Sequence, residues 1–136
     1  MLRGIKIRIY PDDEQMQEMN KLLGCCRFVY NRCLDLKISA YKESKKSLGI
    51  SELNKKIVEI KKQDEFSWLA DAHSKVIQQS LINLNSAYKK FFKEKAGFPK
   101  FKKKKDGDSC RFPVDAVSGV CGNRINLTKK NNQHSF

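Results

Sequence analysis

Hydrophobic and polar residues alternate at the start of the chain. In residues 3–10, three isoleucines alternate with Lys6, Arg8 and Tyr10. This two-residue period predicts a half-buried strand with one basic face. Pro11 ends the strand, because proline has no N–H to donate to a neighbouring strand.

A long helix is predicted next. Asp12 or Asp13 stands in the capping position, and Gln15 follows Asp12 by three residues, as in a capping box. Gly24 weakens the middle of the helix and predicts a kink or a break. The apolar positions recur with helical spacing throughout: Met16, Met19, Leu23, Cys26, Tyr30, Cys33, Leu34, Ile38 and Tyr41.

Two shorter helices follow a loop at residues 45–49. Ser51 is expected to cap the first of them, and the second begins near Ser74 and ends before Gly97 and Pro99. Trp68 and Leu69 are expected to close the end of the bundle. The apolar faces are Leu53, Ile57 and Ile60 for one helix, and Ile77, Leu81, Leu84, Tyr88 and Phe91 for the other.

The last part of the chain predicts extended structure again. A basic run at residues 100–105 leads into a turn at 106–108, and three short extended pieces follow at 109–114, 117–121 and 123–127. Strands on both sides of a helical block indicate an α+β fold, an incomplete small antiparallel β-barrel with an inserted three-helix bundle. The expected domains are a first barrel strand (1–11), a helical insertion (12–98), and a basic loop with partial barrel strands (99–136).

The composition indicates an anionic partner. The 136 residues carry a formal net charge of +13, more than a fold requires, and nucleic acid is the most common partner for such an excess. No stretch is apolar enough to span a bilayer, and the first residues do not resemble a secretory signal. We therefore expect a cytoplasmic protein with no membrane partner and no small-molecule substrate.

Neither a cofactor nor a metal site is expected. The five cysteines include no C-x-x-C pair, and the two histidines lie far apart, which argues against a zinc site and a disulfide framework. Cys26 and Cys33 follow the helical stripe and are expected in the core. No carboxylate stands in an apolar strand, where a nuclease would hold its metal. The chain as it stands is not expected to be an enzyme.

The densest chemical feature is the segment 89–105. Nine lysines and one glutamate give it a formal charge of +8, with four phenylalanines interleaved. Lysines neutralise phosphates with a strong salt dependence, and aromatic rings stack on bases. The alternative is a solvated basic loop, with Phe91 in the core. The helix from Ser74 has a polar face that could read adenine edges, although any surface helix carries amides; it consists of Lys75, Gln78, Gln79 and Asn83.

Several segments together resemble the TnpB (OrfB) proteins of bacterial insertion sequences. The resemblance runs in order over about residues 3–130. It is carried by K-I-R-I-Y-P, G-C-C-R-F-V-Y-N (24–31), A-Y-K, S-W-L, Q-Q-S-L-I-N-L-N-S-A-Y-K-K-F-F (78–92), G-F-P-K-F-K-K-K-K (97–105) and N-R-I-N-L-T-K.

This resemblance implies a wedge-like barrel with an inserted helical recognition lobe. In the family this half holds a guide RNA from the transposon end and reads a short motif beside the DNA target, and a magnesium-dependent RuvC-like nuclease domain follows. Lys75 and Gln78 match the motif-reading helix, and Arg27 and Asn31 match residues expected near the heteroduplex backbone. The family's proline after N-R-I-x-L is Thr128 here, and the RuvC-like acidic residues are missing, so we expect a form truncated before the nuclease domain.

Three functions are compatible with the sequence. The first is a nucleic-acid-binding, non-catalytic part of a bacterial, nucleoid-associated RNA-guided nuclease; the second is a stand-alone helix-turn-helix repressor; the third is a generic basic protein. The predicted nucleic-acid-binding residues are Lys6, Arg8, Arg27, Asn31, Lys75, Gln78, Gln79, Lys89, Lys90, Lys93, Lys95, Lys100, Lys102, Lys103, Lys104, Lys105 and Arg111.

Overall fold

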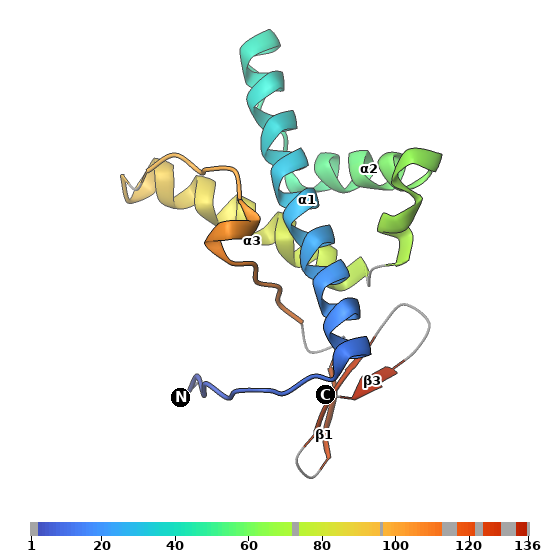
Figure 1. The fold of residues 1–136 in the computed structure, drawn as a ribbon. Coiled ribbons are helices and arrows are strands. Elements are labelled where there is room, and N and C mark those ends of the chain that lie inside the picture. Colours follow the sequence, from blue (N-terminus) through green and yellow to red (C-terminus); the bar gives the residue numbers. More distant parts are fainter. Residues whose placement is uncertain are drawn as a thin grey trace.

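The computed structural model describes most of the chain. It covers residues 3–71, 74–95 and 97–112, and the backbone of strands at 117–121, 124–128 and 133–135. The elements are α1 (Asp13–Ser44), α2 (Ile50–Lys61), the 3₁₀ segment η1 (Asp64–Asp71), α3 (Ser74–Lys93), the 3₁₀ turn η2 (Lys104–Asp106), β1 (Val117–Cys121), β2 (Arg124–Thr128) and β3 (Gln133–Ser135). The described part is mainly helical, and α1 runs through its centre (Figure 1).

Helix α1 begins at the predicted capping box. The Asp12 carboxylate accepts from the Gln15 N–H at 2.8 Å, and the Gln15 side chain accepts from the Asp12 N–H at 3.0 Å. The helix ends where Lys45 adopts a left-handed φ of 57°. It continues through Gly24 without a break, so the predicted interruption is wrong. A helical glycine costs only about 1 kcal/mol, and burial of the adjacent cysteines offsets that cost.

Helix α2 starts two residues earlier than a cap at Ser51 predicts. Gly49 is its N-cap and no side chain caps it, so the cap predicted at Ser51 is wrong. The predicted apolar face is confirmed, because Leu53, Ile57 and Ile60 are all buried. The preceding loop is tied to α1 by the Lys37 ammonium, which donates to the Leu48 carbonyl at 2.6 Å.

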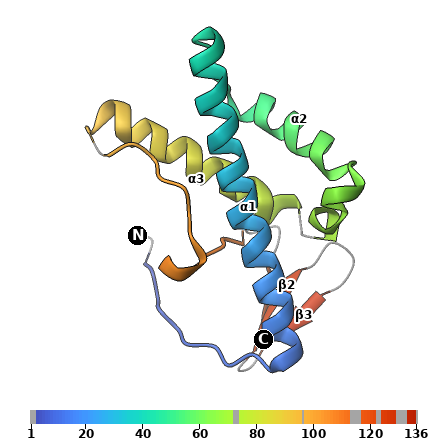
Figure 2. The same cartoon turned by 45° about the horizontal axis from the view of Figure 1, so that its top comes forward.

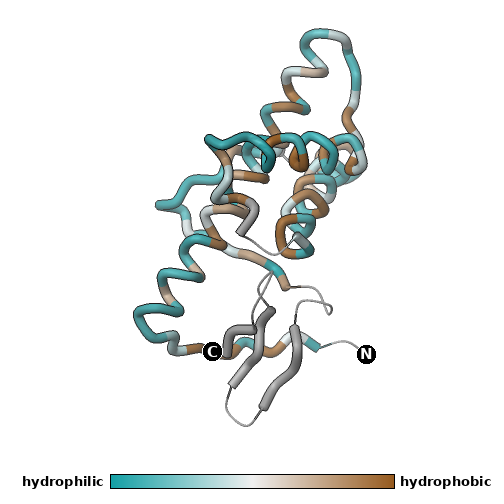
Figure 3. The backbone as a smooth tube through the Cα atoms, turned by 90° about the vertical axis from the view of Figure 1, so that its right-hand side faces the viewer, coloured by the Kyte–Doolittle hydropathy of each residue, from teal (hydrophilic) through white to brown (hydrophobic). Residues whose placement is uncertain are grey.

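The hydrophobic core lies between α1 and α3, with α2 packed against α3. Apolar positions face inward on all three helices (Figure 3). Helix α3 begins at Ser74 as predicted, and Leu69 closes the end of the core while Trp68 stays 43% exposed. Cys26 and Cys33 are buried, which confirms their prediction as core residues. The fully buried residues of largest volume are Leu34, Leu69, Ile77, Leu81, Leu84, Val29, Val76 and Cys33.

The predicted α+β barrel is wrong. Residues 3–10 are extended but form no strand, and Ile5 and Ile7 are 81% and 66% exposed. An alternating pattern marks one apolar face, but a strand also needs a hydrogen-bonding neighbour, and none of the described strands pairs with this segment.

A small antiparallel sheet forms near the other end of the chain, in the order β1-β2-β3. Val120 pairs with Ile125, and Leu127 pairs with His134. Two of the predicted extended pieces correspond to β1 and β2, whereas β3 was not predicted. Residues 109–112 form no strand, and 113–114, the rest of that predicted piece, lie outside the described residues. The domain boundaries after residues 11 and 98 stay a prediction.

Candidate nucleic-acid interface

A basic segment folds back across the helices. We call residues 97–112 the strap. Beyond α3, Lys95 takes a left-handed φ of 55°, and the strap then runs back beside α3 to α1 (Figures 1 and 2). Pro99 is buried, and Gly107, with a φ of 85°, ends the η2 turn in a conformation that suits glycine. The strap is therefore a shaped segment that lies on the helical body.

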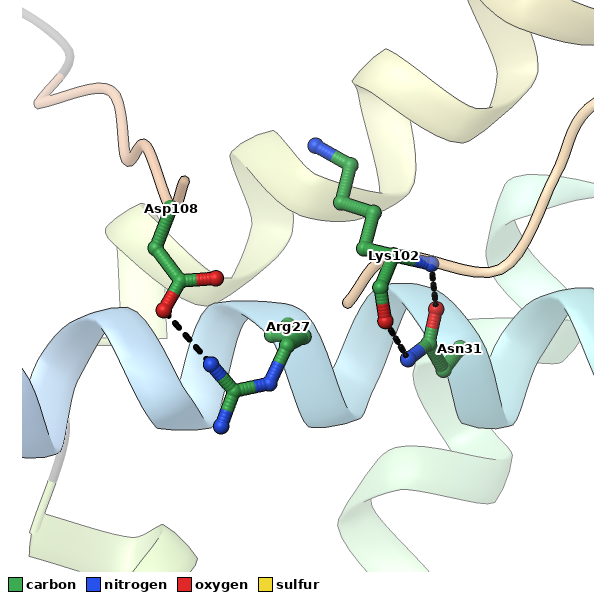
Figure 4. Close-up of polar contacts among 4 residues, drawn as sticks. All are labelled: Arg27, Asn31, Lys102 and Asp108. Carbon is green, nitrogen blue, oxygen red and sulfur yellow. Dashed lines mark hydrogen bonds and ion pairs between the residues drawn. The ribbon is translucent and has the colours of Figure 1, made fainter. Parts of the chain in front are cut away.

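Two polar side chains on one face of α1 hold the strap. The Asn31 amide donates to the Lys102 carbonyl at 2.9 Å and accepts from the Lys102 N–H at 2.7 Å, as a neighbouring strand would (Figure 4). One helical turn earlier, the Arg27 guanidinium pairs with the Asp108 carboxylate at 2.5 Å. Residues four apart lie on the same side of a helix. Arg27 and Asn31 therefore act together as one clip.

The Lys102 side chain reinforces the clip. Its ammonium lies 4.5 Å from the centre of the Tyr30 ring, a cation–π contact. Tyr30 is 7% exposed, and burial raises the pKa of its hydroxyl. Tyr30 therefore packs in the core, as the helical stripe predicts. Lys102 is only half-exposed, unlike the other lysines of the strap.

The far end of the strap is anchored by a second, smaller apolar cluster. Cys110 and Phe112 pack against the buried Cys26 of α1 and Val76 of α3. A hydrogen bond with Cys110, and a further one with Ser80, lower the pKa of the Cys26 thiol. The same bond and burial raise the pKa of Cys110. The strap thus contacts both α1 and α3.

Eight lysines from the last turns of α3 to the η2 turn point their charge to solvent. They are exposed, and none of them has an acidic partner in the ranges that the structure describes. The ion pairs Arg27–Asp108 and Lys46–Glu52 involve none of these lysines. The mutual repulsion of the lysines is therefore not offset by an ion pair within the described residues, which favours an anionic partner. These lysines are Lys89, Lys90, Lys93, Lys95, Lys100, Lys103, Lys104 and Lys105.

The structure does not bring all predicted residues to the strap. Lys6 and Arg8 are exposed on the extended segment 3–12, where Arg8 stacks over the Tyr10 ring at 5.7 Å. At the start of α3, Lys75 and Gln78 are exposed and Gln79 is half-buried. The exposed Arg111 belongs to the strap. The clip itself was not predicted, because its partners lie 71 and 81 residues apart and no local pattern marks them.

Within the described ranges no group of three or more histidine, cysteine, aspartate or glutamate side chains is placed to hold a metal ion. Cys25, Cys26, Cys33 and Cys110 form no disulfide. Of the helices described, none has the length and apolar character needed to cross a membrane.

Comparison with known proteins gives one domain match and several relatives. The OrfB-type model, described as a helix-turn-helix domain, matches residues 1–46. InsQ of Escherichia coli strain K12, named as a candidate RNA-guided DNA endonuclease, is 36% identical over 128 residues, covering 94% of this chain and 32% of InsQ. A similarly named protein of Streptomyces pristinaespiralis is 32% identical, covering 76% of this chain and 26% of its own length.

A third relative is short. Virulence protein VsdF of Salmonella dublin is 37% identical over 113 residues, covering 76% of this chain and 95% of VsdF. This chain spans about a third or less of the length of InsQ and of the Streptomyces relative.

Between residues 3 and 46, where the domain model matches, the structure contains one helix, α1, and no second helix after a turn. The name of the matched domain therefore does not describe the local structure.

Proposed function

Since the chain belongs to the TnpB/OrfB family of transposon-associated proteins, we propose that it binds the guide RNA of its transposon end and the DNA beside the target. The observation that carries this proposal is the strap, on which exposed lysines without acidic partners are held in a defined position by the Asn31 clip. Fixing a basic segment before binding lowers the entropy lost when phosphates are contacted.

We assign the predicted residues to four roles. The eight exposed lysines of 89–105, with Arg111, contact phosphates, and Lys75, Gln78 and Gln79 contact the target DNA. Lys6 and Arg8 add charge from the extended segment. Arg27, Asn31 and Lys102 hold the strap in place, and any contact of theirs with nucleic acid is made from this fixed position.

The same proposal gives this chain no nuclease activity of its own. Within the described residues no group of three or more histidine, cysteine, aspartate or glutamate side chains is placed to hold a metal ion. The names of InsQ and of the Streptomyces relative refer to whole proteins, of which this chain spans 32% and 26%. We further propose that the chain acts at the bacterial nucleoid, where its target DNA lies.

A binding experiment with purified full chain tests the proposal. Affinity is measured for the flanking transposon-end RNA, for random RNA of equal length and for duplex DNA, over a salt series. The expected result is preference for the transposon-end RNA that survives moderate salt. Equal binding to all three, lost together as salt rises, would leave only a basic surface and overturn the proposal.

Two variants with the same change in net charge test whether the strap is the part of the chain that binds RNA. Replacing Lys103, Lys104 and Lys105 with glutamine should weaken RNA binding and reduce the slope of log affinity against log salt by about 0.7 for each phosphate that is no longer neutralised. The control replaces three exposed lysines of the α2 region, Lys55, Lys56 and Lys62, with the same change in net charge. An equal decrease in affinity for both variants would show that net charge, rather than the strap, is responsible.

Two further results would contradict the dependence on RNA or the absence of nuclease activity. Tight binding of a defined DNA duplex without RNA, by a dimer, would indicate a repressor instead. Magnesium-dependent cleavage of DNA by the pure chain would contradict the absence of nuclease activity.

A further inference from the structure

Aromatic rings gather where α3 passes into the strap. Tyr88, Phe91 and Phe92 come from the last turns of α3, and Phe98 comes from the start of the strap. Phe98 contacts Phe91 at 5.2 Å and Tyr88 at 5.5 Å between ring centres, and Phe92 contacts Phe91 at 5.0 Å. Edge-to-face packing of this kind fixes ring orientation. The rings are therefore part of the defined structure.

Several of these rings are unusually exposed. Phe92 is 73% exposed and Phe98 is 45% exposed, and Phe101, further along the strap, is 47% exposed. Leaving large apolar side chains in water gives up the stabilisation that their burial would provide. Phe91 and Tyr88 are partly buried, and of these two rings Tyr88 packs against the hydrophobic core. Phe92 and Phe98 both contact Phe91, so these exposed rings lie together and indicate a binding surface, with Phe101 three residues beyond Phe98.

The surroundings of these rings specify the partner. Lys89, Lys93, Lys100 and Lys103 lie within three residues of an exposed ring, and all four are themselves exposed. A surface that combines aromatic rings with unpaired positive charge fits single-stranded nucleic acid, because unpaired bases stack on rings while phosphates meet the lysines. A duplex presents its phosphates but hides the faces of its bases, so it would leave the rings unused.

We propose that Phe92, Phe98 and Phe101 form a stacking platform for unpaired bases, so that this end of the molecule binds a single-stranded segment of nucleic acid. This proposal rests on the proposed function, because it specifies the form of nucleic acid that the lysines of the same segment bind. Phe92, the most exposed ring, makes the largest contribution to stacking.

The test compares two probes with variants at one position. The probes are an unstructured single-stranded RNA of about 12 nucleotides and an RNA duplex of the same length, at equal salt. Phe92→Ala should weaken binding of the single strand by roughly 5- to 150-fold and change binding of the duplex by less than about twofold. Phe92→Leu, which keeps an apolar side chain but no ring, should show most of the same decrease, and Phe92→Trp should restore the affinity.

A control variant separates stacking from a general decrease in apolar surface. Ile82 is also exposed on α3, at 41%, and lies outside the basic segment. Ile82→Ala should leave both affinities unchanged. Circular dichroism of each variant checks that the helices are intact, and because Phe92 is exposed its replacement should not disturb them.

The outcomes separate this inference from the function on which it rests. If the unaltered chain binds RNA and the strap lysines matter, but Phe92→Ala has no effect or weakens both probes equally, the stacking platform is overturned and the proposed function stands. If the unaltered chain prefers the transposon-end RNA but does not bind the single-stranded probe at moderate salt, the platform is likewise overturned and the proposed function stands. A selective decrease for the single strand, restored by tryptophan, supports the platform.

Discussion

In the helical body, α1, α2 and α3 bury continuous apolar faces against each other, with Leu34, Leu81 and Leu84 completely removed from solvent. In the strap, by contrast, the hold on the body comes from the Asn31 and Arg27 contacts and from a small cluster around Cys110 and Phe112. Helix α1 contributes to both regions. One of its faces packs in the core, and the neighbouring face carries the clip residues Arg27 and Asn31.

This difference has consequences for stability and for binding. A face buried in a common core becomes exposed only when the whole body unfolds, whereas a segment held by a few part-buried hydrogen bonds can detach locally at a lower free energy. The basic segment thus has a defined position without being a structural requirement for the body. Changes in the strap should alter binding while leaving the helices folded.

The largest expected effect is in the body. Leu81→Ala removes a fully buried side chain from the packing between α1 and α3. It should lower the free energy of unfolding by about 2–5 kcal/mol, because the transfer of the side chain and the cavity left behind both contribute. Chemical denaturation followed by circular dichroism measures this. A decrease below about 1 kcal/mol would mean that the helices do not share one core.

A smaller, local effect is expected at the clip. Asn31→Ala removes both hydrogen bonds to the Lys102 backbone and should reduce the stability of strap docking by about 1–3 kcal/mol. Hydrogen exchange at the Lys102 amide should accelerate, by about tenfold for each 1.4 kcal/mol of docking stability removed, while the body unfolds nearly as before. The exposed neighbour Arg32, changed to alanine, is the control. Unchanged exchange at Lys102 would show that Asn31 does not hold the strap.

The third prediction concerns pH and the buried Cys33 thiol. Burial raises the pKa of Cys33 from 9.0 to about 12. Between these values the unfolded chain loses this proton and the folded chain keeps it. The contribution to stability is therefore complete below pH 9, and falls as pH rises, by at most about 1.4 kcal/mol per pH unit.

Comparison with Cys33→Ala isolates this effect. Burial also raises the pKa of Tyr30 and Tyr88, and a hydrogen bond raises that of Cys110, whereas the pKa values of Lys37 and Cys26 are lowered and act in the opposite direction. All of these groups are present in both proteins. The free energy of unfolding, measured from pH 8 to pH 11, should therefore fall less steeply in the variant. Parallel curves would mean that Cys33 is accessible to water in the body.

Local features of the fold could be predicted from the sequence by itself. The capping box at Asp12 needs only residues three apart, and the buried faces of α2 and α3 follow from spacings of three and four. The charge of the segment 89–105 is also a property of composition. These features hold in any fold that keeps the helices, because they depend on neighbours along the chain.

Other features were decided only by the tertiary structure. The alternation in residues 3–10 is real, yet no strand forms there, because strand pairing depends on a distant partner. Asn31 and Lys102 are 71 residues apart, and their hydrogen bonds exist only because α1 and α3 pack so that the strap returns across α1. Periodicity determines which face of a helix is apolar, but tertiary packing determines which distant segment contacts that helix. That is why the lysines could be predicted from the sequence and the clip that positions them could not.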